Sequence, residues 1–190
     1  MATGTETEVK IRLPRKAEIS TVLQSAGFRV SVPRLFEANT LYDTADQKLR
    51  GKGMLLRLRE VGDKVVLTWK GRGEAGPHKS RPERETTIGS AAVLQEILTQ
   101  LDYRPSFRYE KYRTEYVASA SPSMGVVTVD ETPIGDFLEI EGPGDWIDAT
   151  ATQLGFGPKD YILDSYGSLY LSHCKRLGVQ PTNMVFASHG

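Results

Sequence analysis

The chain has 190 residues, of which 39% are hydrophobic, and that is enough for one domain with a single sizeable core. Its 24 lysines and arginines balance 24 aspartates and glutamates, so the composition argues against non-specific binding to nucleic acid or to an anionic membrane. The single cysteine excludes an intrachain disulfide and a thiolate metal site, and without a signal-like or membrane-spanning apolar run we expect a cytoplasmic protein.

Alternating polar and apolar residues predict strands along most of the chain. In the first of them, Val9 and Ile11 share one face and charged residues share the other. A turn at Gly62 and Asp63 predicts that two later runs form a hairpin. The expected strands are, in chain order, 6–13, 34–44, 53–60, 64–71, 81–88, 104–119, 125–133 and 136–142.

Apolar residues at helical spacing predict four helices between and after these strands. The second begins after Ser90, the expected N-cap, and we expect four of its residues to face inward: Leu94, Ile97, Leu98 and Leu101. The helices are expected between Pro14 and Gly27 and at 90–101, 145–155 and 163–178.

Strands separated by a few helices indicate an α+β domain built on a sheet or a barrel, and no repeat or linker divides it. We expect this single domain to span residues 1–178. The Gly-rich segment 71–81 is expected to be a mobile loop, and residues 179–190 a loosely packed tail.

Charged residues recur on one face of several strands, whose opposite faces are as apolar as a core. A solvated exterior would explain any one such strand. Because several strands share the pattern, it predicts a closed barrel with helices packed outside and charges lining a wet interior. Acids and bases must then pair, since an unpaired buried ion is strongly destabilising. The residues are Glu6, Glu8, Lys10, Arg57, Arg59, Lys70, Glu83, Glu85, Lys111, Arg113, Asp130, Glu139 and Glu141.

The residue types on this face suit a metal ion together with a phosphate chain. Carboxylates two residues apart on a strand, such as Glu6 and Glu8, lie roughly 6.6 Å apart and can approach one cation from neighbouring strands. Oxygen ligands without cysteine or histidine on these strands indicate Mg²⁺ or Mn²⁺. The guanidinium fork binds two phosphate oxygens at once, so the bases of this face would hold a triphosphate.

Short motifs along the chain resemble those of the CYTH group of triphosphate tunnel metalloenzymes. The first is ETEVK, which is similar to the ExExK signature of that group, and it is followed in order by LYDTAD, LLRLRE, LTWKG, RPERE, EKYRTEY, VDETPIGDFLEIE and DSYGSLYL. The resemblance covers residues 6 to about 172.

The resemblance implies a closed antiparallel barrel of about eight strands, a tunnel that binds a small-molecule triphosphate with Mg²⁺ or Mn²⁺. Neither a nucleic acid nor a membrane is an expected partner, and a homodimer is left open. The residues that match the metal-binding carboxylates of the family are Glu6, Glu8, Asp130, Glu139 and Glu141. Those that match its triphosphate-binding bases are Lys10, Arg57, Arg59, Lys70 and Arg113, with Lys111 as an addition and Glu83 and Glu85 in support. Glu8, as proton acceptor, and Lys10 are the expected catalytic residues, while Tyr42, Asp43, Ser165 and Tyr166 are either functional or structural.

The reaction is the least determined part of this expectation. Hydrolysis of inorganic triphosphate (PPPi) is preferred, because Met1 to Thr5 lack the His-Phe pair that the cyclase members of the family commonly carry before ExExK. The alternatives are a class IV adenylate cyclase, a thiamine triphosphatase and a non-catalytic polyphosphate or nucleotide sensor. The presence of every expected metal carboxylate argues against the sensor.

Overall fold

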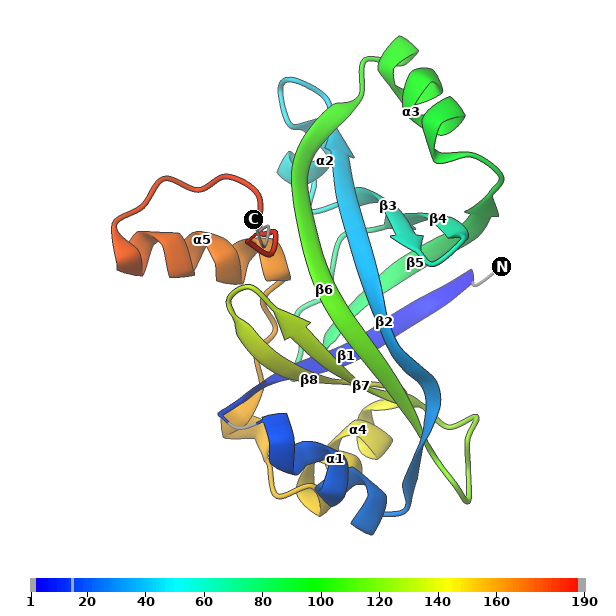
Figure 1. The fold of residues 1–190 in the computed structure, drawn as a ribbon, viewed down its shortest axis with the longest axis vertical. Coiled ribbons are helices and arrows are strands. Elements are labelled where there is room, and N and C mark those ends of the chain that lie inside the picture. The colour runs from blue at the N-terminus through cyan, green and yellow to red at the C-terminus, as the bar shows by residue number, and fades with distance from the viewer. Residues whose placement is uncertain (1–2, 15, 188–190) are drawn as a thin grey trace.

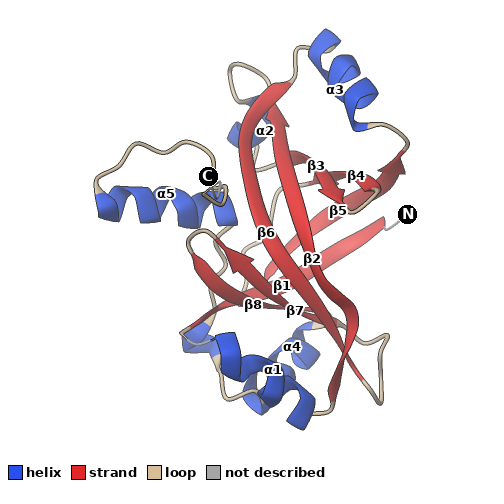
Figure 2. Ribbon diagram, viewed as in Figure 1, coloured by secondary structure: helices blue, strands red, loops and turns tan. Residues whose placement is uncertain are grey.

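The computed structural model describes residues 3–14 and 16–187, and in them eight antiparallel strands close into a barrel (Figure 1; Figure 2). The order around the barrel is β1-β5-β4-β3-β2-β6-β7-β8, and β8 pairs with β1 to close it. The α+β barrel predicted from the alternating charges is confirmed. The strands are β1 Thr3–Leu13, β2 Phe28–Asp43, β3 Leu55–Val61, β4 Lys64–Lys70, β5 Lys79–Ile88, β6 Arg104–Ala118, β7 Val126–Thr132 and β8 Gly135–Glu141.

Helices cover the apolar outer face of the barrel at separate places (Figure 2). α1 and α4 lie over β1, β7 and β8, where Val9, Leu23, Ile140 and Ile147 belong to one buried cluster. Burial of each such side chain stabilises the fold by about 1.5–3 kcal/mol. No helix in the described ranges is long and apolar enough to cross a membrane. The helices are α1 Lys16–Ser25, α2 Lys48–Gly51, α3 Ala91–Gln100, α4 Gly144–Gln153 and α5 Tyr166–Leu177, with a short 3₁₀ turn at Pro158–Asp160.

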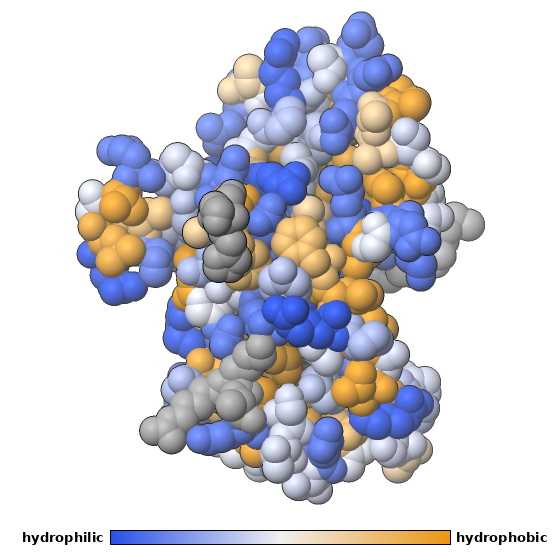
Figure 3. Space-filling view, in the orientation of Figure 1, coloured by the Kyte–Doolittle hydropathy of each residue, from blue (hydrophilic) through white to orange (hydrophobic). Residues whose placement is uncertain are grey.

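The orientation of α3 differs from the prediction. Its Ser90 cap is confirmed, since the side chain accepts a hydrogen bond from the backbone N–H of Val93. Leu98 is buried, but Ile97 and Leu101 are 49% and 61% exposed. α3 packs on a small cluster through the stripe that carries Leu98, so the next ridge of the helix faces solvent, where Figure 3 shows hydrophobic side chains at the surface.

The segment after α5 differs from the prediction at one point: residues 179–183 are exposed as expected, but Met184 docks on the barrel. Met184 is 1% exposed and forms a parallel bridge to Tyr109 on β6. The backbone N–H of Glu110 donates to the Met184 carbonyl at 2.9 Å. β7 pairs with β6 only from Tyr112 to Tyr116, so the earlier part of β6 has a free edge that this segment covers. Residues 188–190 of the predicted tail lie outside the described residues.

Candidate functional site in the barrel interior

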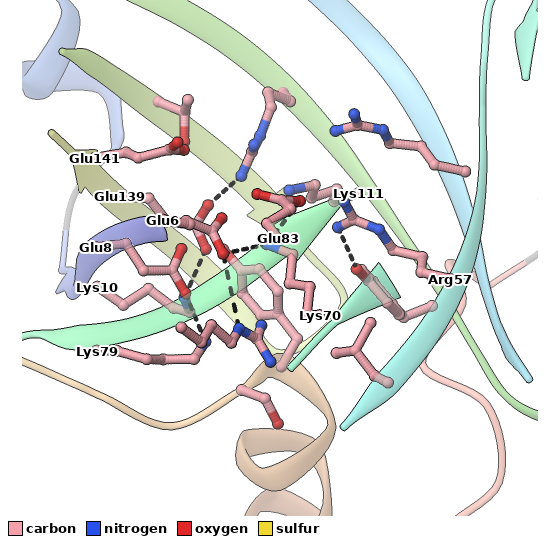
Figure 4. Close-up of a pocket in the computed structure, with 18 of the residues that line it drawn as sticks. Glu6, Glu8, Lys10, Arg57, Lys70, Lys79, Glu83, Lys111, Glu139 and Glu141 are labelled. Atoms are coloured by element: carbon pink, nitrogen blue, oxygen red, sulfur yellow. Dashed lines mark hydrogen bonds and ion pairs between the residues drawn. The ribbon is translucent and has the colours of Figure 1, made fainter. Parts of the chain in front are cut away.

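The inner face of the barrel encloses a cavity of about 290 Å³. Side chains alternate between the two faces of a strand, so residues at every second position reach this cavity. All eight strands and the start of α5 contribute to its lining. Every predicted site residue except Asp130 lies in that lining (Figure 4): Glu6, Glu8, Lys10, Arg57, Arg59, Lys70, Glu83, Glu85, Lys111, Arg113, Glu139 and Glu141.

Lys10 lies at the centre of a chain of alternating charges. Its Nζ donates to Glu139 Oε1 at 2.6 Å and is 3.7 Å from Glu8 Oε1. Glu8 also accepts a hydrogen bond from Lys79 Nζ at 2.5 Å, and Glu139 accepts one from Arg113. These side chains therefore reinforce the backbone pairing of β1 with β5 and β8, and they link β8 to β6 across the intervening β7.

The wall formed by β3, β4 and β5 carries a second set of ion pairs. Lys70 contacts Glu6, and its Nζ lies 3.3 Å from Glu83 Oε1 (Figure 4). On the neighbouring strand, Arg59 Nη2 donates to Glu85 Oε2 at 3.1 Å. These are the oppositely charged partners that the mixed composition of the inner face requires.

Arg57 has the weakest link to an acid. Its Nη2 donates to Thr68 Oγ1 at 3.2 Å and its Nη1 to the Tyr109 hydroxyl at 3.4 Å. The nearest recorded carboxylate oxygen, on Glu85, is 3.9 Å from Nη2, and every other base of the lining has an acid closer than that. Arg57 is thus the base whose charge is least neutralised by the protein itself.

Asp130 lies in the wall behind the cavity and not in its lining. It is 0% exposed and accepts hydrogen bonds from Lys111 Nζ at 2.9 Å, from Arg113 Nε at 2.7 Å and from the Tyr166 hydroxyl at 2.7 Å. With both oxygens engaged by donors, its carboxylate holds two bases in place. Direct contact with a metal ion, which the family resemblance implies, would require these donors to move.

Two bases of the lining, Lys79 and Arg81, were not predicted. The segment 71–81 was expected to be a mobile loop, but β5 already begins at Lys79, so that expectation is wrong for Lys79 and Ser80, while Arg81 was also expected to begin the strand 81–88. Lys79 pairs with Glu8 and Arg81 with Glu6 in the register of β1 and β5. The signal was present, because charges at 79 and 81 continue the alternation of 83 and 85, but the Gly-rich composition before them and Pro82 obscured it.

Glu37 on β2 is a third functional candidate that sequence reasoning missed. It is 4% exposed, with Oε2 3.6 Å from Lys111 Nζ and Oε1 3.9 Å from Arg59 Nη1. Its strand was read from its β-forming residues, and a single acid among them gives no i, i+2 pattern of charge. The next inward residues, Asn39 and Leu41, are uncharged.

The charges of the interior shift the pKa values of its acids. Burial alone raises the pKa of Glu37, but Lys111 and the nearby arginines outweigh it and lower that pKa to about 2. Burial likewise raises the pKa of Glu8, but Lys10 and Lys79 outweigh it and hold the pKa far below its ordinary value. Both acids therefore stay ionised near neutral pH.

Glu141 is the exception among these acids. Its side chain reaches solvent at the end of β8, yet protein atoms surround it on most sides, and burial together with repulsion from Glu6 raises its pKa to about 7. No described base forms an ion pair with it. This carboxylate lies in the cavity lining with Glu6 and Glu8 (Figure 4), and among the described residues only the more distant charge of Lys70 acts to lower its pKa.

Comparison with known families assigns the chain to one of them. A family model described as the CYTH domain matches residues 4–165. The chain belongs to the CYTH family.

Relatives of this CYTH protein carry two kinds of name. A Methanocaldococcus jannaschii protein named "Putative adenylate cyclase" is 24% identical over 136 residues, which are 72% of this chain and 75% of that protein. A solved structure of a "putative adenylate cyclase" from Vibrio parahaemolyticus has a TM-score of 0.78 at 21% identity and covers 90% of this chain and 99% of that one. The structure of HpAC1 from Hippeastrum, described as revealing a dominant triphosphatase activity, has a TM-score of 0.60 at 16% identity and covers 93% of this chain and 97% of that one. At these identities the solved structures show a shared fold.

Of the four residues that sequence reasoning left undecided, three contribute to turn geometry, outer packing or helix capping in this CYTH domain. Asp43 accepts hydrogen bonds from the backbone N–H groups of Thr44, Leu49 and Arg50 and so holds the start of α2. Tyr42 lies in the outer cluster under α3, and Ser165 caps α5. Tyr166 alone reaches both the cavity and its bases.

The acids of the CYTH domain fit a hard divalent cation in their chemistry, although they are not arranged as a finished site. Within residues 3–14 and 16–187, no three His, Cys, Asp or Glu side chains converge on one point. Most of the acids turn toward a base instead, as Glu6 does toward Lys70 and Glu8 toward Lys79. The carboxylate oxygens suit Mg²⁺ or Mn²⁺, and Glu141 has no ion-pair partner among the described residues. The other acids would bind a cation once their bases leave them to bind an anion.

Proposed function

We propose that this CYTH protein is a divalent-metal-dependent phosphohydrolase that converts inorganic triphosphate and water into pyrophosphate and phosphate. The observation that carries the proposal is the single inner face on which bases and carboxylates alternate around the cavity. A ligand must bring both a phosphate chain for the bases and a cation for the acids to satisfy this face. Metal-bound triphosphate has that composition.

The size and lining of the cavity favour PPPi over a nucleotide. A volume of about 290 Å³ lies at the lower end of the range of about 300–1,000 Å³ for ligand pockets. Its aliphatic lining consists of Leu41, Leu55 and Val126. A small, fully charged ligand uses this surface better than one that carries a nucleobase.

The bases of this chain would bind and orient the phosphate chain. Lys10, Lys111 and Arg113 exchange their carboxylate partners for phosphate oxygens, and these charge-assisted hydrogen bonds hold the terminal phosphate in one orientation. Arg57 and Arg59 come from β3 and would bind the part of the chain that departs as pyrophosphate.

The acids of β1 and β8 would hold the cation. When bound, Mg²⁺ or Mn²⁺ supplies positive charge to the phosphate oxygens and orients a water molecule for attack. Glu6, Glu8 and Glu141 are the residues that we assign to it. A strongly lowered pKa makes Glu8 a weak proton acceptor, so we assign it to cation binding rather than to the proton-accepting role that the sequence suggested.

A direct assay tests this proposal. Purified protein is incubated with PPPi, ATP or thiamine triphosphate, each with Mg²⁺ and with Mn²⁺, and phosphate, pyrophosphate and cyclic AMP are measured. We expect phosphate from PPPi in a metal-dependent reaction that EDTA stops. The absence of turnover with every substrate would leave a non-catalytic sensor of polyphosphate or nucleotides.

An adenylate cyclase is the second candidate, and the names of the relatives from Methanocaldococcus jannaschii and Vibrio parahaemolyticus favour it. Cyclisation needs the 3′ oxygen of the nucleotide to be ordered against the α-phosphate. Pyrophosphate and cyclic AMP formed from ATP, at a rate above that of PPPi hydrolysis, would replace our proposal with this one.

Mg²⁺ binding is expected to strengthen as the pH rises toward about 7 and then to level off. The pKa of Glu141 in the folded protein is about 7, against 4.5 for an ordinary glutamate, so below neutral pH the cation must displace a proton. By the same shift, Glu141 favours folding most below about pH 4.5, and this contribution is lost as the pH rises through about 7. Calorimetric titration of Mg²⁺ between about pH 5.5 and about pH 8.5 measures the effect on binding.

The matched variant for this experiment is Glu141→Gln, which keeps the shape of the side chain and has no proton to lose. It should bind Mg²⁺ more weakly and without the inflection near neutral pH. If the inflection persists in Glu141→Gln, another group is responsible for it and the assignment of Glu141 is wrong.

A further inference from the structure

Tyr166, the first residue of α5, connects the C-terminal helix to the bases of the cavity. Ser165 caps the helix by accepting a hydrogen bond from the backbone N–H of Ser168, which fixes the direction in which α5 leaves the barrel. The ring of Tyr166 lies in the cavity wall and is 7% exposed. The rings of Tyr109 and Phe137, with centroids 6.1 Å and 5.5 Å from its own, hold it from the sides.

Two lysine ammonium groups lie near the centre of this ring. Lys10 Nζ is 4.9 Å from the ring centroid and Lys111 Nζ is 5.4 Å from it, both within the ~6 Å over which an aromatic face attracts a cation. The ring partly offsets two positive charges without accepting a proton or ligating a metal. Unlike a carboxylate in the same place, it does not compete with a phosphate for the N–H donors of the lysines.

The hydroxyl of Tyr166 reaches the acid behind those lysines. It donates to Asp130 Oδ2 at 2.7 Å, and Asp130 also accepts from Lys111. Burial, followed by the charge of Asp130, raises the pKa of Tyr166 well above its ordinary value, so the hydroxyl remains a donor. One side chain therefore contacts two bases through its ring, and through its oxygen it supports Asp130, the buried acid that pairs with Lys111.

We propose that Tyr166 is a positioning residue for the phosphate chain, whose ring holds Lys10 and Lys111 where they can bind it. The inference rests on the proposed function, which places a triphosphate in this cavity. It extends that function to the C-terminal helix, which otherwise contributes neither an acid nor a base to the lining. The ring, rather than the hydroxyl, is the part of Tyr166 that binding requires.

Three variants separate the ring, the hydroxyl and general packing. Tyr166→Phe keeps the ring and loses the hydroxyl, while Tyr166→Met fills the space without a ring. Tyr170→Met is the matched control, because Tyr170 lies one turn further along α5 and packs on Phe107 away from the lysines. Affinity is measured by calorimetry for PPPi in EDTA and for a non-hydrolysable triphosphate with Mg²⁺, so that binding is read without turnover in both conditions. Thermal unfolding is recorded for each variant.

We expect Tyr166→Met to weaken PPPi binding at least about tenfold, Tyr166→Phe by less than about threefold and Tyr170→Met by less than about twofold. Equal losses in Tyr166→Met and Tyr170→Met would reduce Tyr166 to a packing role and overturn the inference. A Tyr166→Phe variant that loses as much affinity as Tyr166→Met would also overturn the inference. If Tyr166→Met does not fold, Tyr166→Leu replaces it in both comparisons.

The outcome for this inference is distinguishable from that for the proposed function. A wild-type protein that binds PPPi but hydrolyses no triphosphate contradicts the hydrolase, and the order of affinities among the variants still decides the role of Tyr166. A wild-type protein that binds a triphosphate neither in EDTA nor with Mg²⁺ contradicts both.

Discussion

Replacing Glu8 by glutamine is expected to lower metal-dependent PPPi turnover at least about 100-fold, with a lower thermal stability but an intact fold. Glu8 is 6% exposed, accepts a hydrogen bond from Lys79 and lies 3.7 Å from Lys10. Glutamine preserves its shape and an acceptor oxygen but removes the charge that a hard cation requires. Because two lysines would lose their common acid, part of the effect is a more positive interior that binds PPPi without a productively placed cation.

Three measurements identify this mechanism. Turnover is measured over a wide range of Mg²⁺ concentrations, affinity for PPPi is measured in EDTA, and unfolding is followed by heating. Glu131→Gln is the control, because Glu131 is also an ion-paired acid on a strand but bonds to Arg34 on the outside of the barrel. Near-normal turnover in Glu8→Gln, or an equal loss in Glu131→Gln, would contradict the assignment of the cation to β1.

The inner face of the barrel was largely predictable from the sequence. In ETEVK, the apolar Val9 between two charged neighbours sets which face is buried against helices, and therefore which face carries Glu8 and Lys10 inward. The same parity places Arg57 and Arg59 correctly on β3. The alternation of side chains along a strand depends only on neighbouring residues, so it can be read directly from the sequence.

The partners of these charges were not predictable, because they depend on long-range register. Lys10 and Glu139 are separated by 129 residues in sequence and meet only because β8 closes the barrel against β1. Lys79 continues the alternation of charges at 83 and 85, but its Gly-rich surroundings hid this signal, and its pairing opposite Glu8 shows its place. No periodicity within one strand encodes which strand lies beside it.

The alternation of charges also could not predict whether an inward side chain lines the cavity or is covered by other side chains. Asp130 has the parity of an inward residue, yet Lys111, Arg113 and Tyr166 close over it and leave it 0% exposed. Thr128, two positions earlier on β7, still lines the cavity, so it is the side chains packed over Asp130 that make it part of the wall. A motif match transfers the residue type but not this geometry.

Pairing across the interior explains how a chain with no net charge can present a site for a polyanion. The lining bases are matched by acids at short range, so the ligand-free barrel avoids the cost of unpaired buried ions. A bare anion has to displace those acids and leave them uncompensated, so we expect it to bind measurably but more weakly than an anion that carries a cation. A phosphate chain that carries a cation can replace both partners of each pair, and we expect this exchange to be the basis of selectivity.

Arg57 has the least need to give up an acid partner before it can bind phosphate. Its replacement by alanine is expected to weaken PPPi binding about 100-fold while lowering kcat much less. Its guanidinium is held by Thr68 and by the Tyr109 hydroxyl, with the nearest recorded carboxylate oxygen 3.9 Å away. Each hydrogen bond to a charged group contributes about 1.5–3 kcal/mol, so loss of a bidentate contact to phosphate gives an effect of this order. Affinity for PPPi in EDTA and the steady-state KM are the quantities to measure.

The comparison with lysine distinguishes charge from geometry at this position. Arg57→Lys keeps the positive charge but not the two-pronged donor, so its affinity should lie between those of the wild type and Arg57→Ala. Arg34→Ala, which removes an ion-paired arginine from the outer surface, should bind PPPi as the wild type does. If Arg57→Ala retained its affinity for PPPi, the phosphate chain could not lie along β3, and the face formed by β1 and β8 would have to hold it alone.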